Sequence, residues 1–454
     1  MGRAFDPRQS NRREFLRQVG QGVAGASLML GPGAQPWASA ATDRPKVKVA
    51  AVVTEFTYRS HAHVILENFI NPYIFNGKST ESGCEIVALY LDQVPAKDIG
   101  KEIAKEVGIP IYPSIAKALC RGGDKLAVDA VLSIGEHGKY PVNAKKQMEY
   151  PRKRFFDEIV AVFEDSGRVV PVFNDKHLSY RWDWAREMVE TSRRLNFPFM
   201  AGSSVPLAQR RPPLDLPEGA ELRQAVSIHG GGLESYDFHG IEVLQSMVES
   251  RRGGETGVKS VQFLPQSVVW DVAKEIDGNL ELASAAMTAE LGAGTAPVQE
   301  LLAKQFAKSH THGILIEYVD GLKGMILKVG DDATRWNFAT RIGAETTPRA
   351  AHFYVGPWQN RNLFKALSHA IQTMFHTGKA PYPVERTLMT SGILDSAMDS
   401  YIAEGKAIET PQLRFSYSPI NYRPMREMGS SWEIITKDTP EPLGLDRYAP
   451  KPQS

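Results

Sequence analysis

The chain has 454 residues, of which 42% are hydrophobic and 23% charged, and its formal net charge is +1. This length predicts two or three domains with a sizeable core, and the balanced charge excludes a general attraction to nucleic acid or acidic lipid. Because the only cysteines are Cys84 and Cys120, disulfides cannot staple a chain of this size. We expect two ordinary buried thiols, and one Cys84–Cys120 disulfide is the alternative.

The first forty residues have the pattern of an export signal. Arg12-Arg13 precedes a weakly apolar run from Val19 to Leu30, and Ala38-Ser39-Ala40 matches a cleavage site. The run is shorter than the ~20 residues that a membrane span needs, and nothing later in the chain resembles a span. We predict a twin-arginine signal peptide over residues 1–40, recognition by the twin-arginine translocase, and a periplasmic or secreted mature protein from Ala41. A surface helix with a chance arginine pair is the alternative.

Apolar runs alternate with helical stretches in the first half of the chain. Continuous apolar runs are typical of strands that are buried on both faces of a parallel sheet. The expected strands are 47–53, 85–91, 128–134, 169–173 and 198–201, and the expected helices lie near 60–69, 95–107, 155–166 and 182–195. This alternation predicts βαβ units and a Rossmann-type α/β domain, with a parallel sheet, over residues 41–205.

The pattern changes after the segment 202–219, which is rich in Pro, Ser and Arg. Strand-like runs with fewer helices between them follow at 223–229, 258–264, 313–318, 325–329, 338–342 and 352–355. They predict an α+β domain over residues 206–417, with an open, largely antiparallel sheet and helices on one face. The uncovered face would offer a surface for a homo-oligomer. Residues 418–454 form a Pro-rich tail that we expect to wrap the surface or a partner.

Six short stretches of the chain point to one known family. They are Glu85–Asp92, Gly108–Tyr112, Val128–Val131, Asn174–His177, Gly230–Glu242 and Pro383–Arg386. With them, most of residues 46–415 resembles the glucose-fructose oxidoreductase / inositol dehydrogenase (Gfo/Idh/MocA) family. The resemblance implies a nicotinamide dinucleotide, NAD or NADP, across the carboxyl ends of the strands, and a sugar or polyol as the substrate. An exported member would have to hold this cofactor tightly, because it is loaded before export.

The resemblance places the cofactor between the ends of the early strands. Thr54 and Arg59 would contact the diphosphate, although residues 54–59 contain none of the glycines that let a diphosphate reach a helix N-terminus. Asp92 would accept hydrogen bonds from the adenosine ribose and favour NAD, or it simply ends a strand in a turn. Glu136 and His137 follow a later strand and would line the same cleft. Two interpretations stay open: the loop still binds a diphosphate, or no dinucleotide binds.

Lys176 and His239 are the expected catalytic residues. Lys176 stands in Asp-Lys-His where the family has Glu-Lys-Pro, and an ammonium there can contact the cofactor and polarise a substrate oxygen or relay a proton. His239 lies in the stretch that resembles the family's D-x-x-x-H helix, with Ser235 at the position of the carboxylate. His177, Ser235 and Asp237 are predicted to contact the substrate. The alternatives are a solvated loop lysine and a histidine hydrogen-bonded within the domain interface.

Two H-x-H pairs, His61/His63 and His310/His312, would each need further ligands to hold zinc, so we predict no metal site. The main hypothesis is an exported, NAD(P)-dependent oxidoreductase acting on a carbohydrate or polyol. The alternative is a non-redox carbohydrate-binding protein, lyase or hydrolase that keeps the cleft, the lysine and the histidine but binds no dinucleotide.

Overall fold

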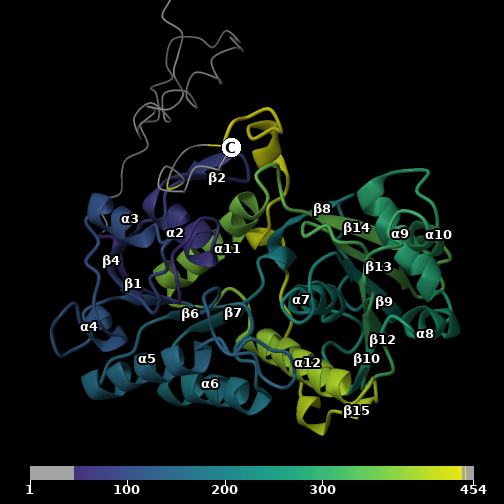
Figure 1. The fold of residues 1–454 in the computed structure, drawn as a ribbon, viewed down its shortest axis with the longest axis horizontal. Helices are drawn as coiled ribbons and strands as arrows, with labels where there is room; N and C mark the ends of the chain where they lie inside the picture. Colours follow the sequence, from purple (N-terminus) through teal and green to yellow (C-terminus); the bar gives the residue numbers. More distant parts are fainter. Residues whose placement is uncertain (1–44, 442–444, 446–454) are drawn as a thin grey trace, which may run out of the picture.

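The computed structural model describes residues 45–441 and 445, which form two domains side by side (Figure 1). The twin-arginine signal that we predicted for residues 1–40 lies outside the described residues. Among the residues that the model describes, no helix is long and apolar enough to cross a membrane.

The first domain is built around a parallel five-stranded sheet in the order β4-β1-β5-β6-β7. Its strands are β4 (Cys84–Leu91), β1 (Val47–Val53), β5 (Ala130–Ile134), β6 (Val172–Asp175) and β7 (Phe199–Gly202). This confirms the predicted Rossmann-type sheet. The order places β1 and β5 side by side in the middle, so the loops that follow them meet at one edge of the sheet.

Helices cover both faces of this sheet, which explains its continuous apolar runs. Alternate residues of β1 point to opposite sides, with Val49 and Val53 in one core and Ala50 and Val52 in the other. The first core packs on α2 (His61–Ile70), α3 (Gly100–Val107) and, from much later in the chain, α11 (Asn360–Thr377). The second packs on α4 (Ile115–Leu119), α5 (Arg152–Ser166) and α6 (Trp182–Leu195). A short hairpin of β2 (Tyr73–Phe75) and β3 (Lys78–Thr80) lies beside α11.

The second domain contains an eight-stranded sheet in the order β15-β10-β11-β12-β9-β13-β14-β8. Only β12 and β9 pair in parallel, so the prediction of a largely antiparallel sheet is confirmed. The strands are β8 (Gln209–Arg211), β9 (Leu222–His229), β10 (Val258–Leu264), β11 (Gly313–Tyr318), β12 (Lys323–Lys328), β13 (Trp336–Ile342), β14 (Arg349–Tyr354) and β15 (Ile408–Glu409).

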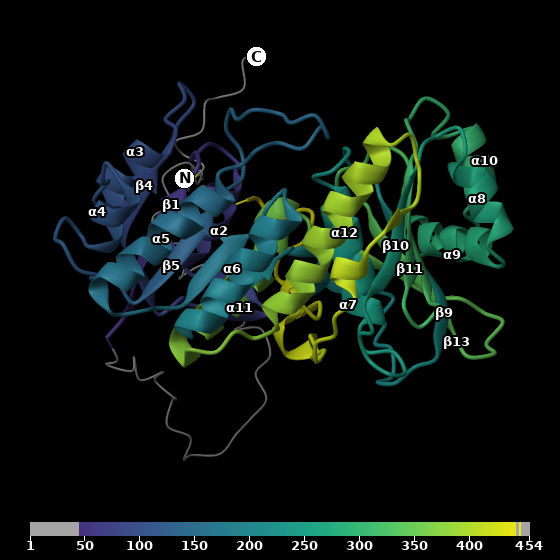
Figure 2. The ribbon, with the colours of Figure 1, turned by 90° about the horizontal axis from the view of Figure 1, so that it is seen from below.

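Both faces of the second sheet are covered, so the prediction of helices on one face is wrong (Figure 2). One face packs on α7 (Asp237–Val248) and α12 (Val384–Ile402), and α12 also lies against α6 of the first domain. The other face packs on α8 (Val269–Glu275), α9 (Asn279–Leu291) and α10 (Val298–Ala303). The α9 side chains Leu282, Ala286 and Met287 are fully buried there. The broad face that we expected to be available for a homo-oligomer is therefore filled by the chain itself.

The cysteines are free and buried in different cores. Cys84 belongs to the core beneath α11, and Cys120 to the core beneath α5. The alternative of a Cys84–Cys120 disulfide is excluded in this structure.

Candidate functional site

A cavity of about 640 Å³ opens between the two domains, at the carboxyl end of the parallel sheet. The loops after β1, β5, β6 and β7 and the start of α11 line it from the first domain, and the start of α7 and the loop before β13 line it from the second. Ligands of open α/β sheets bind at this edge. The cavity also has a size typical of small-molecule sites.

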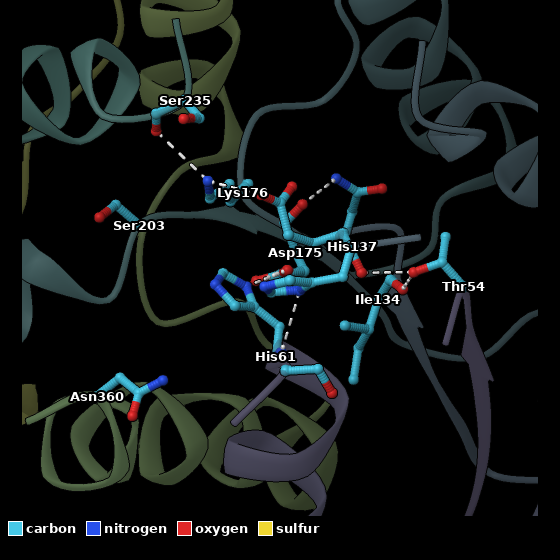
Figure 3. A network of polar contacts seen from close by, with 12 residues as sticks. Thr54, His61, Ile134, His137, Asp175, Lys176, Ser203, Ser235 and Asn360 are labelled. Atoms are coloured by element: carbon cyan, nitrogen blue, oxygen red, sulfur yellow. Dashed lines mark hydrogen bonds and ion pairs between the residues drawn. The ribbon is translucent and has the colours of Figure 1, made fainter. Parts of the chain in front are cut away.

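Lys176 lies in this cavity and is paired with a buried carboxylate. Its Nζ is 2.8 Å from Glu136 Oε1 and donates to the backbone oxygen of Ser235 at 3.4 Å (Figure 3). The second carboxylate oxygen of Glu136 accepts from Arg152. Burial alone raises the pKa of Glu136, but the charges of Lys176 and Arg152 outweigh it and hold this pKa well below its usual range. Glu136 is therefore an anion that fixes the lysine.

His239 faces the same cavity from the first turn of α7. Its Nδ1 lies 2.6 Å from the hydroxyl oxygen of Ser203, which follows β7. Burial, and then the positive charge of Lys176, lower the pKa of His239 well below its usual value, so the imidazole is neutral at neutral pH. Ser203 holds the ring from the other domain, whereas Ser235, which we expected to do so, contributes its carbonyl to Lys176.

A third polar pair enters the cavity from α2. His61 is the first residue of that helix, and its Nδ1 lies 2.6 Å from Oδ2 of Asp175, the last residue of β6. The ring of His61 packs edge-on against His137 at 5.1 Å and against Phe364 at 4.6 Å. Burial, more than any other influence, lowers the pKa of His137 to about 4, so this second ring is neutral as well.

Two of the three predicted substrate ligands lie behind the wall of the cavity. Both Asp237 and His177 are buried, and only Ser235 lines the space. Oδ1 of Asp237 is 3.0 Å from Nε2 of His229 and 2.8 Å from Nε2 of His312. In this structure neither Asp237 nor His177 reaches the cavity: both oxygens of Asp237 have partners inside the protein, and Nε2 of His177 lies against Arg152 and Glu234.

His229, Asp237 and His312 also form a group whose ligand atoms lie within 4.8 Å of one another, close enough to hold a metal ion. However, Nδ1 of His229 accepts from the amide of Gly231, so the proton of this ring sits on Nε2 and points at Asp237. We interpret the cluster as a hydrogen-bonded network that fixes the glycine-rich loop before α7.

The loop after β1 does not present the open backbone that a diphosphate needs. Thr54 is fully buried and donates its hydroxyl proton to the carbonyl oxygen of Glu136, and Phe56 is buried in the core. The hydroxyl oxygen of Ser60 accepts from the amide of His63 in the first turn of α2. Of the predicted phosphate ligands, only Arg59 lines the cavity, where it forms an ion pair with Glu441.

The crevice expected to hold the adenosine is closed by the protein. The carboxylate of Asp92 accepts hydrogen bonds from Tyr90, Tyr140 and Arg154. Next to it, the side-chain amide of Gln93 exchanges two hydrogen bonds with the backbone of Lys139, which ties the loop after β4 to the loop after β5. The residues at this end of the sheet therefore do not fit a dinucleotide.

The backbone around the cavity is locally strained. Of the ten non-glycine residues with positive φ in the described part of the chain, four line the cavity: Arg59, His137, Lys176 and Gln359, with φ between 50° and 71°. Left-handed conformations cost a residue with a Cβ atom about 1–2 kcal/mol, and such residues gather at functional sites. This concentration supports a functional role for the cavity.

Some of these residues were missed by sequence reasoning. His61 was considered only as half of a zinc pair, and Asp175 only as a neighbour of Lys176. Ser203 received no role of its own, whereas His137, which was expected to line the cleft together with Glu136, does line the cavity. The signal that could have found His61 and Asp175 is positional, because each follows a predicted strand at the carboxyl edge of the sheet.

Comparisons with known proteins give a match in fold alone. No family model matches the chain, and no curated protein sequence does. GenD2 from gentamicin A biosynthesis, solved in complex with NAD, is 12% identical over 81% of this chain and 97% of its own, with a TM-score of 0.50. Scyllo-inositol dehydrogenase from Lactobacillus casei, solved with NAD(H) and scyllo-inositol, is 11% identical over 80% of this chain and 99% of its own, also at 0.50. The two-domain fold that the Gfo/Idh/MocA resemblance implied is thus found here.

Proposed function

We propose that this cavity is the active site of an enzyme that binds a sugar or polyol and catalyses a proton-transfer reaction on it without a dinucleotide. The observation that carries the proposal is the buried Lys176–Glu136 ion pair, which shares the cavity with the neutral imidazole of His239. An ammonium stabilises a developing negative charge on oxygen, and a neutral imidazole accepts a proton. A lyase or hydrolase uses this combination.

The walls of the cavity suit a polyhydroxylated ring. The rings of Tyr236 and Trp336 stack at 5.4 Å with an interplanar angle of 7°, and both residues line the cavity. Flat aromatic faces pack against the apolar faces of sugars. Polar groups such as Lys176 and Asn360 also line the cavity, where they can bind hydroxyl groups (Figure 3).

A second candidate function is NAD(P)-dependent hydride transfer to or from the same class of substrate. It is favoured by the fold, because similar structures were solved with NAD, and by the position of Lys176 at the end of a strand. It would require the loop after β5 to leave Asp92 and open the adenosine crevice. The closed crevice makes this the second choice.

One experiment separates the two functions. The purified protein is denatured, any released ligand is analysed by mass spectrometry, and the native protein is titrated with NAD⁺, NADH, NADP⁺ and NADPH by calorimetry. We expect no released dinucleotide and no heat of binding, whereas monosaccharides and polyols raise the melting temperature. A dinucleotide that co-purifies or binds would establish the hydride-transfer function instead.

We also propose that the chain is exported by the twin-arginine route, a proposal supported by Arg12-Arg13 and the Ala38-Ser39-Ala40 cleavage pattern. Replacing both arginines with lysine should retain the precursor in the cytoplasm. Cell fractionation would measure this, and unchanged export of the variant would exclude the route.

A further inference from the structure

Among the described residues that line the cavity, two histidines each have a polar side-chain partner of their own. The proposed function uses only one of them, His239. The other is His61, whose partner Asp175 comes from a different element. Asp175 is 1% exposed, so its carboxylate is almost fully removed from water. A buried carboxylate that meets a cavity-lining imidazole requires its own explanation, because an unneeded buried charge is costly.

The geometry fixes which nitrogen of His61 carries the proton. A carboxylate is an acceptor, so Nδ1, at 2.6 Å from Asp175 Oδ2, is the N–H that donates to it. The neutral ring then has its lone pair on Nε2. His137 and Phe364 pack against the ring and hold its orientation. His61 therefore has the arrangement of a general base whose imidazolium form a carboxylate stabilises.

The His61–Asp175 pair occupies the place in the fold where a dinucleotide would bind. The first turn of the helix after β1 is where a dinucleotide diphosphate rests in this type of fold. In this chain the first residue of that helix is His61, and its own amide donates to Nδ1 of His137 at 3.5 Å. The imidazole of His61 and the carboxylate of Asp175 therefore lie where this type of fold binds a diphosphate.

We propose that His61 and Asp175 form a second acid–base centre of this cavity, in which His61 is a catalytic base and Asp175 its positioning residue. The inference rests on the proposed function, since it assumes that a sugar occupies the cavity. The substrate class is a sugar or sugar acid that carries a carbonyl or carboxyl group next to the carbon that loses a proton.

The step balances without an oxidant. His61 Nε2 takes the proton from the carbon, and the electron pair of the broken C–H bond forms a C=C bond to the carbonyl carbon. The π electrons of the carbonyl group move to its oxygen, where the ammonium of Lys176 stabilises the negative charge. Asp175 stabilises the imidazolium through the Nδ1–H bond. Return of the proton, or loss of a neighbouring oxygen substituent, completes an epimerisation or an elimination.

The first test needs no substrate. The full mature protein is labelled with ¹⁵N-histidine, and its imidazole tautomers are measured by long-range ¹H–¹⁵N correlation at mildly alkaline pH. The signal that His61→Gln removes should show a protonated Nδ1 and a bare Nε2, and Asp175→Asn should shift the ring toward the Nε2–H form. The matched control His310→Gln, at an exposed histidine outside the cavity, should leave the His61 signal in place. A protonated Nε2 on His61 in the unaltered protein would overturn the inference.

The second test measures the proton transfer itself. The protein is incubated in D₂O with D-fructose or D-galacturonate, and loss of the signal of the proton next to the carbonyl or carboxyl group is followed by ¹H NMR. We expect exchange that His61→Gln slows by about 10²-fold or more, that Asp175→Asn slows less, and that His310→Gln does not change. Equal rates for His61→Gln and the unaltered protein, with equal melting temperatures, would rule out His61 as the base. Absence of exchange by the unaltered protein would overturn this step, whereas monosaccharides and polyols that fail to raise the melting temperature would overturn the proposed function.

Discussion

The hydroxyl of Tyr140 donates to the carboxylate of Asp92 at 2.7 Å. Asp92, which the sequence resemblance predicted to bind the adenosine ribose, thus accepts a hydrogen bond from the loop that follows β5. Tyr90 and Arg154 bind the same carboxylate. These bonds lower the pKa of Asp92 even though burial, the largest single influence, raises it. The anion is satisfied internally, so nothing about its environment requires a ligand.

Tyr140→Phe should lower the free energy of unfolding by about 1–3 kcal/mol, the contribution of a hydrogen bond to a charged group. Urea denaturation would measure the change. Tyr58→Phe is the matched control, because the Tyr58 side chain is 46% exposed, and it should be neutral. A stable Tyr140→Phe variant that gained affinity for NAD would instead show that this bond merely gates an intact cofactor site.

Lys176→Met should destabilise the fold as well as abolish turnover. Removing one partner of a buried ion pair costs about 3–5 kcal/mol, because the other charge is left buried, although Arg152 still binds Glu136 here and reduces the loss. The double variant Lys176→Met/Glu136→Gln should recover stability but not activity, as judged by thermal melting and by the proton-exchange assay. Recovery of activity in the double variant would contradict a chemical role for the lysine.

Glu249 should contribute stability that is lost as pH rises from about 4.5 to about 7. Burial raises the pKa of Glu249 from 4.5 to about 7, with Arg386 opposing the shift. Because the folded state holds this proton more tightly than the unfolded chain, the contribution of Glu249 to the free energy of unfolding decreases between pH of about 4.5 and about 7.

Glu249→Gln should remove about 3 kcal/mol of this pH dependence, on the scale of 1.36 kcal/mol per pKa unit. Urea denaturation at a series of pH values would measure the slope. Glu281→Gln, at an exposed carboxylate, is the control and should leave the slope unchanged. An unchanged slope in Glu249→Gln would show that this carboxyl group stays ionised in the fold.

Neither thiol should react in the native protein. Burial raises the pKa of Cys84 to about 12 and also raises that of Cys120, so little thiolate forms at mildly alkaline pH. Ellman's reagent should therefore report almost no thiol before denaturation and two thiols per chain afterwards, without reductant. Absence of thiols after denaturation would show that the two cysteines pair.

Much of the architecture could be predicted from the sequence. Strands that are apolar on both faces, such as Val47–Val53, indicate a parallel sheet directly, and α6 was predicted with its observed bounds. The 19-residue α12 was missed, because 15 of its residues are buried and they lie on every face of the helix. The sequence therefore shows no polar stripe of the kind that marks a surface helix. The cover formed by α8–α10 was missed for a different reason: which face a helix packs on depends on topology, not on local periodicity.

The site was predictable only in part. The prediction found Lys176, Glu136 and His239 in the sequence, and the structure brings all three to one cavity. It could not find the hydrogen-bond partners of the two histidines, because these partners are distant in the sequence. Asp175 is 114 residues from His61, and Ser203 is 36 residues from His239. Asp237 and His177 were predicted in the cavity because sequence spacing does not show which way a side chain turns.

The four left-handed residues around the cavity also bear on how the protein could be engineered. Arg59, His137, Lys176 and Gln359 each lie on a separate loop, and glycine would adopt their backbone angles with less strain. A selection for variants with a higher melting temperature should therefore enrich glycine first at Gln359, the one of the four to which we assign no role in binding or catalysis. The backbone strain at these four positions lowers the stability of the fold and fixes the directions of side chains around the cavity.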